Sequence, residues 1–388
     1  MDVALTDGPV EIIGALDFDR TETGIAPRRL PAWTRRQIPD LFMDFMVTLT
    51  TGVRLAFRTD SSWIELDAMP TGFSIVGVPA PVIAFDLVVD GRRVAREVGD
   101  FGTRLVIDLM TFDLKVEPGE PAQLHFDVEP AGAGSADEGV MREIEIWLPQ
   151  SAATELRALR VADGARAEPP THTQRVWAHH GSSISHCIEA HGPTEIWPAV
   201  AARLGDVELR QFAFAGQCHL DQFVARTIAA QHVDLISLKL GINVVNADSL
   251  SQRTFPPAVH GFLDTLRERH PATPILVISP IICPMAEDHP GPTVPDGHGG
   301  YRVVPGGPPE LRALSLTLRR IRTILAEVVA GRQEAGDANL HFLDGLELFG
   351  EADAPDLPDG LHPHGDGYVR MGERFAAHAF APNGPFAR

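Results

Sequence analysis

Short runs in which hydrophobic and polar residues alternate occupy the chain from about residue 42 to residue 147. This period of two is typical of strands that bury one face, and Asp90-Gly91 supplies a turn between two of the runs. The pattern therefore predicts an antiparallel β-sandwich. Its strands include residues 46–50, 53–57, 63–66, 83–89, 124–128 and 144–148, and the Ala/Gly/Ser-rich residues 130–139 are predicted to form a hairpin tip.

Beyond about residue 170 the pattern changes, because apolar strand runs alternate with segments of helical period. This alternation predicts an α/β domain with a mostly parallel sheet and a ligand cleft at the carboxyl ends of its strands. Strands are predicted at 175–180, 207–214, 233–240 and 275–279, and helices at 194–204, 220–231, 257–270 and 310–331. In the last helix, one buried face is predicted to comprise Leu314, Leu318, Ile321, Leu325 and Val328.

The domain boundary is placed near residue 170, because residues 162–173 have the Ala/Pro/Glu/Thr composition of an interdomain connection. We therefore predict a sandwich domain over residues 1–170 and an α/β domain over residues 171–388.

Composition and charge narrow the possible partners. The 388 residues carry a formal net charge of −19, which argues against binding to nucleic acid or an anionic membrane. Small molecules are the expected partners. The three cysteines do not suggest a disulfide framework, and the amino terminus lacks the apolar run of a signal peptide, so we expect a cytoplasmic protein. The oligomeric state does not follow from these features.

Four short motifs carry candidate chemistry. Ser183 follows the strand run 175–180 directly, in a setting that exposes a nucleophilic hydroxyl at a turn. Asp359 and His362 form a D-x-x-H turn, in which the carboxylate can fix the imidazole tautomer that accepts a serine proton. Gly216 and Asn243 follow two further strands, where a backbone N–H and a side-chain amide can stabilise an oxyanion. Together these motifs predict serine-based acyl chemistry.

The four motifs, in this order, resemble those of the SGNH or GDSL family of serine esterases and acyltransferases. The resemblance implies a flavodoxin-like catalytic domain, with Ser183 as the nucleophile and Asp359 and His362 as its acid/base partners. It also implies an oxyanion hole formed by Ser183, Gly216 and Asn243. Two positions depart from the family pattern: Ser182 stands where an Asp precedes the nucleophile, and Val244 stands where an Asp follows the Asn.

The segment Gly181-Ser182-Ser183-Ile184-Ser185-His186 is similar to a subgroup of this family. In that subgroup a β-sandwich precedes the catalytic domain, and one branch acylates polyketide hydroxyls in tetracycline-type pathways. The resemblance implies an esterase that acts on a small-molecule or carbohydrate acyl ester and needs no cofactor. One alternative is an acyltransferase, with acyl-CoA and a hydroxyl compound as partners. The other is a non-catalytic protein whose jelly-roll-like sandwich binds carbohydrate.

Several other residues near the motifs have competing interpretations. His180, His186 and His219 are predicted to shape a substrate pocket rather than bind a metal, because no metal-ligand spacing accompanies them. Cys187 is a second, weaker candidate nucleophile. The Pro/Gly-rich loop 284–308 is either a substrate lid or a surface loop. The basic residues Arg28, Arg29, Arg35 and Arg36 form a candidate site for a phosphate such as that of coenzyme A.

Overall fold

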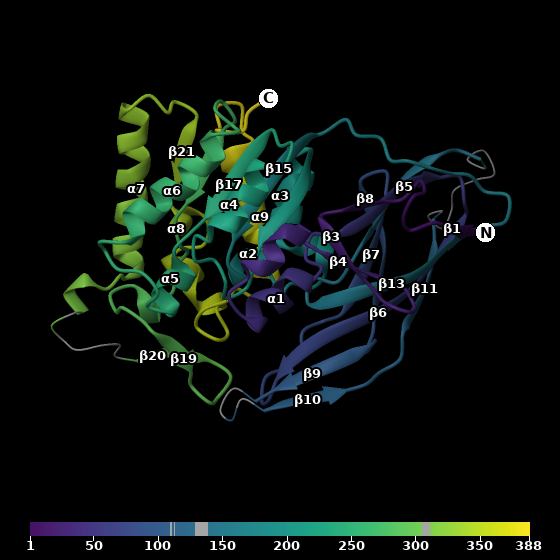
Figure 1. Ribbon diagram of the computed structural model, residues 1–388, viewed down its shortest axis with the longest axis horizontal. Coiled ribbons are helices and arrows are strands. Elements are labelled where there is room, and N and C mark those ends of the chain that lie inside the picture. The colour runs from purple at the N-terminus through teal and green to yellow at the C-terminus, as the bar shows by residue number, and fades with distance from the viewer. Residues whose placement is uncertain (109–110, 112, 129–138, 305–309, 311) are drawn as a thin grey trace. The chain divides into compact units, whose positions relative to one another are not determined.

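The computed structural model describes residues 1–108, 111, 113–128, 139–304, 310 and 312–388. The chain divides into two compact units (Figure 1). The first comprises Met1–Gln174 and Ile188–Glu195, and the second comprises Arg175–Cys187 and Ile196–Arg388. The hairpin tip predicted at 130–139 lies, except for its last residue, outside the described part of the chain.

The first unit contains two sheets, as the alternating pattern predicts. The larger sheet contains β1 (Asp2–Val3), β3 (Asp17–Arg20), β4 (Ile25–Arg28), β6 (Trp63–Ile75), β9 (Thr103–Ile107), β10 (Leu114–Glu117), β11 (Ala122–Asp127) and β13 (Ala152–Val161). The smaller contains β2 (Glu11–Ile13), β5 (Arg54–Thr59), β7 (Ala84–Val89), β8 (Arg92–Val98), β12 (Arg142–Trp147) and β14 (Ala167–Glu168). Within this unit, the described strand pairs are antiparallel except for β6 with β9, which is parallel.

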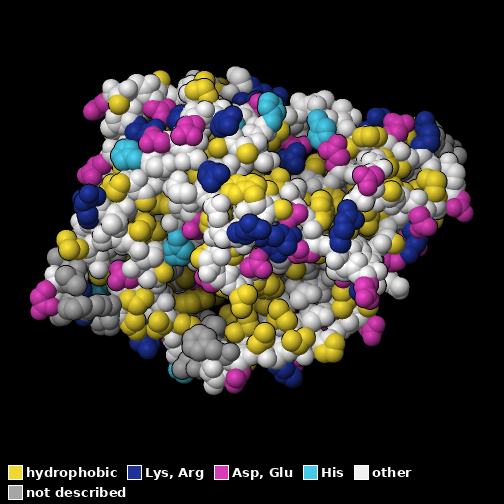
Figure 2. All heavy atoms as spheres, viewed as in Figure 1, with side chains coloured by type: hydrophobic (Ala, Val, Ile, Leu, Met, Phe, Trp, Pro, Cys, Tyr) yellow, Lys and Arg dark blue, Asp and Glu magenta, His cyan; other side chains and the backbone are white. Residues whose placement is uncertain are grey.

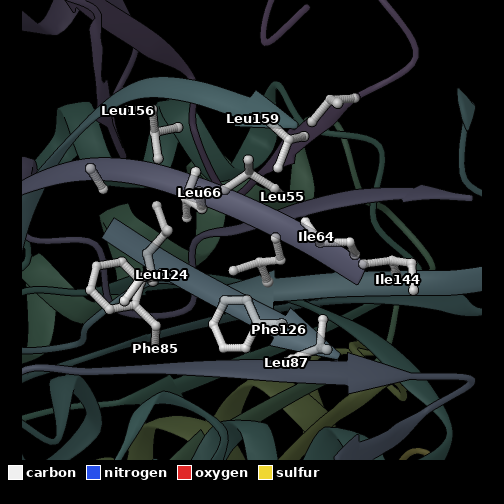
Figure 3. Close-up of a cluster of buried hydrophobic side chains, with 14 of the residues drawn as sticks. Leu55, Ile64, Leu66, Phe85, Leu87, Leu124, Phe126, Ile144, Leu156 and Leu159 are labelled. Atoms are coloured by element: carbon white, nitrogen blue, oxygen red, sulfur yellow. The ribbon is translucent and has the colours of Figure 1, made fainter. Parts of the chain in front are cut away.

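Side chains from both sheets form the hydrophobic core of this unit (Figure 3). Strand β6 buries every second residue along its whole length, and β11 does the same. The core includes Ile64, Leu66, Leu124, Phe126, Leu156 and Leu159 from the larger sheet, and Leu55, Phe85, Leu87 and Ile144 from the smaller. The period-two signal is therefore produced by burial of one face of each strand. Asp90 and Gly91 both have positive φ, as the predicted turn between β7 and β8 requires.

One predicted strand of this unit is wrong. Residues 46–50 were expected to be extended, but most of them belong to α1 (Leu41–Thr48), which follows the short helix η1 (Ala32–Arg36). The carboxylate of Asp40 caps α1 by accepting a hydrogen bond from the N–H of Met43. Met43, Met46 and Val47 then lie on one buried face at helical spacing. The cap and this spacing outweigh the local alternation of Met46–Thr50.

The second unit is built on a parallel five-stranded sheet in the order β16-β15-β17-β18-β21. These strands are β15 (Arg175–Gly181), β16 (Val207–Ala213), β17 (Leu235–Lys239), β18 (Ile275–Ile278) and β21 (Leu340–Leu343). Numbered along the chain, the order is 2-1-3-4-5, which is flavodoxin-like and confirms the predicted fold class. In such a sheet, the switch point lies at the carboxyl ends of the first and third strands, here β15 and β17.

Helices cover both faces of this sheet. On one face, Trp177 of β15 stacks on Phe375 of α9 (Gly365–Ala379) and packs against Trp197 of α3 (Trp197–Gly205). On the opposite face, His180 stacks on Phe262 of α6 (Phe255–Arg267), which packs with α4 (Gln222–Ala229). The remaining elements are η3 (Pro193–Glu195) in the first unit and, in the second, α2 (Ser183–His186), α5 (Ile242–Asn246), η4 (Pro284–Ala286), β19 (Thr293–Pro295), β20 (Tyr301–Val303), η5 (Arg312–Leu314), α7 (Leu318–Glu334), α8 (Gly345–Leu348) and η6 (Glu351–Asp356).

The helix predicted at 310–331 begins later than expected. Thr317 caps α7 by accepting a hydrogen bond from the N–H of Arg320, so the helix covers Leu318–Glu334. Leu318, Ile321, Leu325 and Val328 are buried as predicted, but Leu314 precedes the helix in η5 and is exposed. The apolar spacing correctly identified the buried face, whereas the cap set the start of the helix.

The segment Ile188–Glu195 belongs to the first unit although it follows α2 of the second. Asp86 of β7, which is fully buried, holds it by accepting hydrogen bonds from the N–H and the hydroxyl of Thr194. The guanidinium of Arg96 binds both carboxylate oxygens of Asp86 at 2.6 and 2.7 Å, and it also binds Glu195 at 2.6 Å. These charge-assisted bonds satisfy a carboxylate that would otherwise be costly to bury.

We predict that Asp86→Ala destabilises the protein by about 3–5 kcal/mol, because it leaves Arg96 without its buried counter-ion. Asp100→Ala is the matched control, since it removes a carboxylate that pairs with Arg104 but is 82% exposed. Denaturant unfolding of the full chain should show a large loss of stability for Asp86→Ala and almost none for Asp100→Ala. Equal stabilities for the two variants would contradict this assignment.

Candidate active site

Ser183 lies on a tight turn at the carboxyl end of β15. It is the first residue of the four-residue helix α2 and is partly exposed, whereas Ser182 and Ile184 beside it are buried. Cys187 ends this helix in the left-handed conformation, with φ of 61°. A side chain at Gly181 would place its Cβ 2.5 Å from Oγ of Ser185, so the turn requires glycine there.

The D-x-x-H turn lies near the end of the sequence and contacts this serine. Nε2 of His362 lies 2.8 Å from Oγ of Ser183, and Nδ1 lies 2.7 Å from Oδ2 of Asp359. The other carboxylate oxygen, Oδ1, accepts hydrogen bonds from the N–H groups of Leu361 and His362 at 2.8 and 2.7 Å. Helix α9 begins at Gly365, directly after this turn. The structure therefore brings the three residues into one hydrogen-bonded series.

The environment keeps Asp359 ionised. Burial alone would raise the pKa of its carboxyl, but the hydrogen bond and charge of His362 and the two backbone N–H groups outweigh burial and lower that pKa. An ionised carboxylate accepts the Nδ1 proton of His362, which leaves Nε2 as the acceptor that faces Ser183. Nε2 of His362 can thus accept the proton of the Ser183 hydroxyl.

Gly216 and Asn243 follow the two strands that flank β15. Gly216 has φ of 70° in the turn after β16, and Asn243 lies in α5, which follows β17 through Gly241. Oδ1 of Asn243 accepts a hydrogen bond of 3.0 Å from the N–H of Cys218, so the amide nitrogen is the end left to donate. Three adjacent parallel strands therefore bring Ser183, Gly216 and Asn243 to the same edge of the sheet.

The side chains of His180 and His186, which are predicted to shape a substrate pocket, are both buried. Nδ1 of His180 donates to the carbonyl of Phe212 at 2.7 Å, and Nε2 faces Sγ of Cys218 at 3.4 Å. Burial lowers the pKa of His180 to about 4, so the ring is neutral at pH 7. His180 thus supports Cys218, the residue that orients Asn243.

His219 is half-buried and remains at the turn that carries Gly216. Its Nε2 donates to the carbonyl of Gly216 at 3.1 Å, and Nδ1 accepts from the hydroxyl of Ser249 at 3.0 Å. A role in a substrate pocket stays a prediction for this residue. Among the described residues, no group of three or more His, Cys, Asp or Glu side chains is arranged to hold a metal ion.

Cys187 does not have the setting of a nucleophile. Its side chain is fully buried, and its thiol donates to the carbonyl of Ile184 at 3.3 Å, within the turn that it terminates. Nucleophilic cysteines need exposure and a nearby positive charge or helix terminus that favours the thiolate. The packing role of Cys187 therefore fits better than the alternative of a cysteine nucleophile.

Three arginines of the basic cluster near residue 30 are held by contacts within the protein. Arg28 is buried and pairs with Asp19 and Asp44, and Arg35 pairs with Asp19 and with a second aspartate, Asp17. Arg29 is also buried and donates to two main-chain carbonyls, and burial lowers its pKa to about 9. Arg28 and Arg35 are thus paired with carboxylates, and the guanidinium of Arg29 is held by main-chain carbonyls. On the face shown in Figure 2, basic and acidic side chains are likewise interspersed.

Part of the predicted loop 284–308 contacts the acid–base turn. The strands β19 and β20 form a hairpin, and the N–H of Tyr301 in β20 donates to the carbonyl of Asp359 at 3.3 Å. The ring of Tyr301 lies 5.9 Å from that of His362 in an edge-to-face arrangement. At the other end of the hairpin, Thr293 donates to the side chain of Asn246 in α5. Residues 305–308 lie outside the described chain.

Sequence reasoning missed a buried polar layer beneath the site. His179, Gln211 and Ser237 are buried on neighbouring strands, and Lys239 at the end of β17 is 1% exposed. Nζ of Lys239 has no hydrogen-bond partner in the described part of the chain. Burial lowers the pKa of this ammonium to about 8. The sequence contains one signal that could have identified this layer. Buried parallel strands are almost continuously apolar, so polar residues within such runs indicate buried polar contacts.

Comparisons with known proteins bear on the family and the fold of the chain. Residues 179–370 match the sequence model of the GDSL-like lipase/acylhydrolase family. Among solved structures, the salicylyl-acyltransferase SsfX3 from a tetracycline biosynthetic pathway is 27% identical, with a TM-score of 0.78, over 96% of this chain and 95% of that chain. A putative GDSL-like lipase from Bacteroides ovatus is 19% identical, with a TM-score of 0.63, over 95% and 94% of the two chains. The comparison with curated proteins found no match.

A family two carbohydrate esterase from Clostridium thermocellum shares the fold at 13% identity, with a TM-score of 0.57, over 95% of this chain and 97% of that chain. The fold and the family match together define a serine ester hydrolase, a class that also contains acyltransferases. The carboxyl-terminal domain belongs to the GDSL-like lipase/acylhydrolase family. This confirms the predicted family, enzyme class and fold. Among the described helices, none is both long and apolar enough to cross a bilayer.

We predict that Lys239→Met raises stability at pH 7 by about 1–3 kcal/mol, because it removes a buried charge without breaking a described hydrogen bond. The folded-state pKa of about 8 lies below the unfolded value of 10.5. Between these values the unfolded chain binds more protons, so the stability of the wild type rises with pH there and carries the full penalty below pH 8.

The other lysine of the chain provides the control for this prediction. Lys115 is 73% exposed and pairs with Glu117, so Lys115→Met should leave the unfolding midpoint unchanged. Thermal unfolding of both variants at pH 7 and pH 9 measures the difference. If Lys239→Met proved less stable than the wild type, the ammonium would have a stabilising partner that the buried setting does not reveal.

Proposed function

We propose that the protein is a serine esterase that forms an acyl-enzyme on Ser183, with His362 and Asp359 as its acid/base pair. The hydrogen-bonded series from Asp359 through His362 to Ser183 carries this proposal. The non-catalytic alternative is less well supported, since a binding protein has no need for a base within hydrogen-bond distance of an activated hydroxyl.

In the proposed reaction, Oγ of Ser183 attacks the ester carbonyl while Nε2 of His362 takes its proton. The carbonyl oxygen then carries negative charge, which the N–H groups of Ser183 and Gly216 and the amide of Asn243 stabilise. His362 returns the proton to the leaving alcohol as the ester C–O bond breaks, and an acyl-serine remains. Water, deprotonated by the same histidine, attacks the acyl-serine and releases the carboxylic acid and free Ser183.

The proposed substrate is the acyl ester of a small molecule or of a carbohydrate. The net charge of −19 favours a neutral substrate over a polyanion. Acyl transfer is a second candidate, favoured by the 27% identity to a salicylyl-acyltransferase over nearly the whole of both chains. In that case a hydroxyl compound replaces water in the second half of the reaction. The pairing of Arg28 and Arg35 with carboxylates removes the local support for coenzyme A.

We predict that a fluorophosphonate probe labels Ser183 in the folded protein and that Ser183→Ala lowers turnover of an aryl acetate by at least about 1,000-fold. The Cys187→Ala variant, which removes the other candidate nucleophile, should keep both the label and the activity. Peptide mapping identifies the labelled residue. A label on any other residue, or an active Ser183→Ala variant, would refute the proposal.

We predict that Asn243→Ala lowers kcat by about 100–1,000-fold, because it removes one donor to the oxyanion. Asn246→Ala is the matched control, since it removes the same side chain one turn further along α5. Steady-state kinetics of both variants, with melting temperatures measured alongside, separate a loss of transition-state stabilisation from a loss of folding. Full activity in Asn243→Ala would exclude this residue from the oxyanion hole.

Hydrolysis and transfer can be separated with the wild-type enzyme. If the acyl-enzyme reacts with water alone, the products should be the free acid and the alcohol. Adding a phenol or a sugar as an acceptor should then leave these products unchanged. If the enzyme is a transferase, the added hydroxyl compound should become acylated, and the total rate of release of the first alcohol should rise. Chromatography of the products with and without the acceptor distinguishes the two.

A further inference from the structure

The helix that carries Ser183 is too short to maintain its own conformation. Helix α2 has four residues, from Ser183 to His186, whereas isolated helices shorter than about 12 residues are marginal in water. Its main-chain bonds close a single turn, in which the carbonyl of Ser182 accepts from the N–H groups of Ser185 and His186. The orientation of Ser183 therefore depends on contacts from outside the helix.

Two strands provide those contacts from beneath, both through Ser185. Oγ of Ser185 lies 2.8 Å from Nε2 of His179 in β15, and its carbonyl accepts a hydrogen bond of 2.7 Å from Nε2 of Gln211 in β16. His179 and Gln211 are paired in register, so their side chains lie on the same face of the sheet. Ser185 is two residues from Ser183 on the same turn. A displacement of Ser185 therefore moves the nucleophile.

His179 is itself held at its other ring nitrogen. Nδ1 lies 2.7 Å from Oγ of Ser237 in β17, and this hydroxyl accepts a hydrogen bond of 2.9 Å from Nε1 of Trp177. His179 is fully buried, and Trp197 packs edge-on against it with ring centroids 4.6 Å apart. The imidazole is therefore fixed at both ends and on one side. It links β15 and β17 to the turn of Ser183 in a single series of hydrogen bonds.

We propose that His179 is a positioning residue, which fixes Oγ of Ser183 for reaction by holding Ser185 through Nε2. This inference rests on the proposed function, in which Ser183 is the nucleophile. His179 does not touch the reacting atoms, and it acts only through the geometry of α2. The hydrogen bond to Ser185 performs the positioning, and the bond to Ser237 keeps the ring in place.

Two substitutions separate these bonds. In His179→Gln the side-chain amide reaches the position of Nε2 and can still bind Ser185. In His179→Asn the shorter amide reaches only the position of Nδ1, so Ser237 keeps its partner and Ser185 loses its own. We expect kcat to fall about 10–100-fold in His179→Asn with KM unchanged, and to stay within about threefold of the wild type in His179→Gln. Ser185→Ala should resemble His179→Asn.

The rate constant of fluorophosphonate labelling at Ser183 is the second readout, because it reports the reactivity of the nucleophile directly. It should fall by the same factor as kcat in His179→Asn and Ser185→Ala. Thr227→Val is the control for loss of a buried hydroxyl. Thr227 is fully buried in α4 and its hydroxyl donates to the carbonyl of Phe223, so this variant should lower the melting temperature without changing either rate.

Two outcomes would overturn the inference. Wild-type kinetics in His179→Asn would show that the bond to Ser185 does not position the nucleophile. If the rates of His179→Asn, His179→Gln and Thr227→Val all fell in proportion to the loss of melting temperature, these residues would act only through the stability of the fold. Both outcomes are distinct from failure of the proposed function, because in that case the probe would not label Ser183 in the wild type.

Discussion

A hydrogen bond of 2.8 Å joins His362 to Ser183 across 179 residues of sequence, and the arrangement of the catalytic domain serves to maintain it. The parallel sheet makes this possible, because every strand ends at the same edge and the connecting helices return the chain to the opposite edge. Ser183 follows the first strand and Asn243 follows the third, so both lie at the switch point of the strand order. His362 then arrives from the turn before α9, the last helix.

The same sheet carries several buried polar side chains. His179, Gln211, Ser237 and Lys239 lie in strands that are otherwise apolar, and three of the four are hydrogen-bonded to their neighbours or to α2. Burial of such groups opposes folding unless each finds a partner. A buried network has one advantage over an apolar floor, because its bond lengths and directions specify a single position for the turn above it.

Much of this arrangement could be predicted from the sequence. Periodicity identified the sandwich, the parallel sheet and the buried face of α7. The short motifs predicted that Ser183, Asp359 and His362 act together. Periodicity failed at Met46–Thr50, where the cap provided by Asp40 decided the conformation. It also could not show that His180 and His186 face the interior. A histidine beside a motif looks the same whether it faces substrate or supports the residue behind it, and only the packing of Phe262 and Cys218 distinguishes the two for His180.

The path of the chain through its two units has a consequence for how such enzymes diversify. The polypeptide leaves the sandwich at Gln174, forms β15 and the turn of Ser183, and returns to the sandwich for Ile188–Glu195 before completing the catalytic domain. Recombination at a single joint near residue 174 would therefore separate Asp86 from the segment that it binds. An exchanged sandwich must bring its own partner for these eight residues. The two units are thus expected to be inherited together, as a pair, rather than shuffled as independent modules.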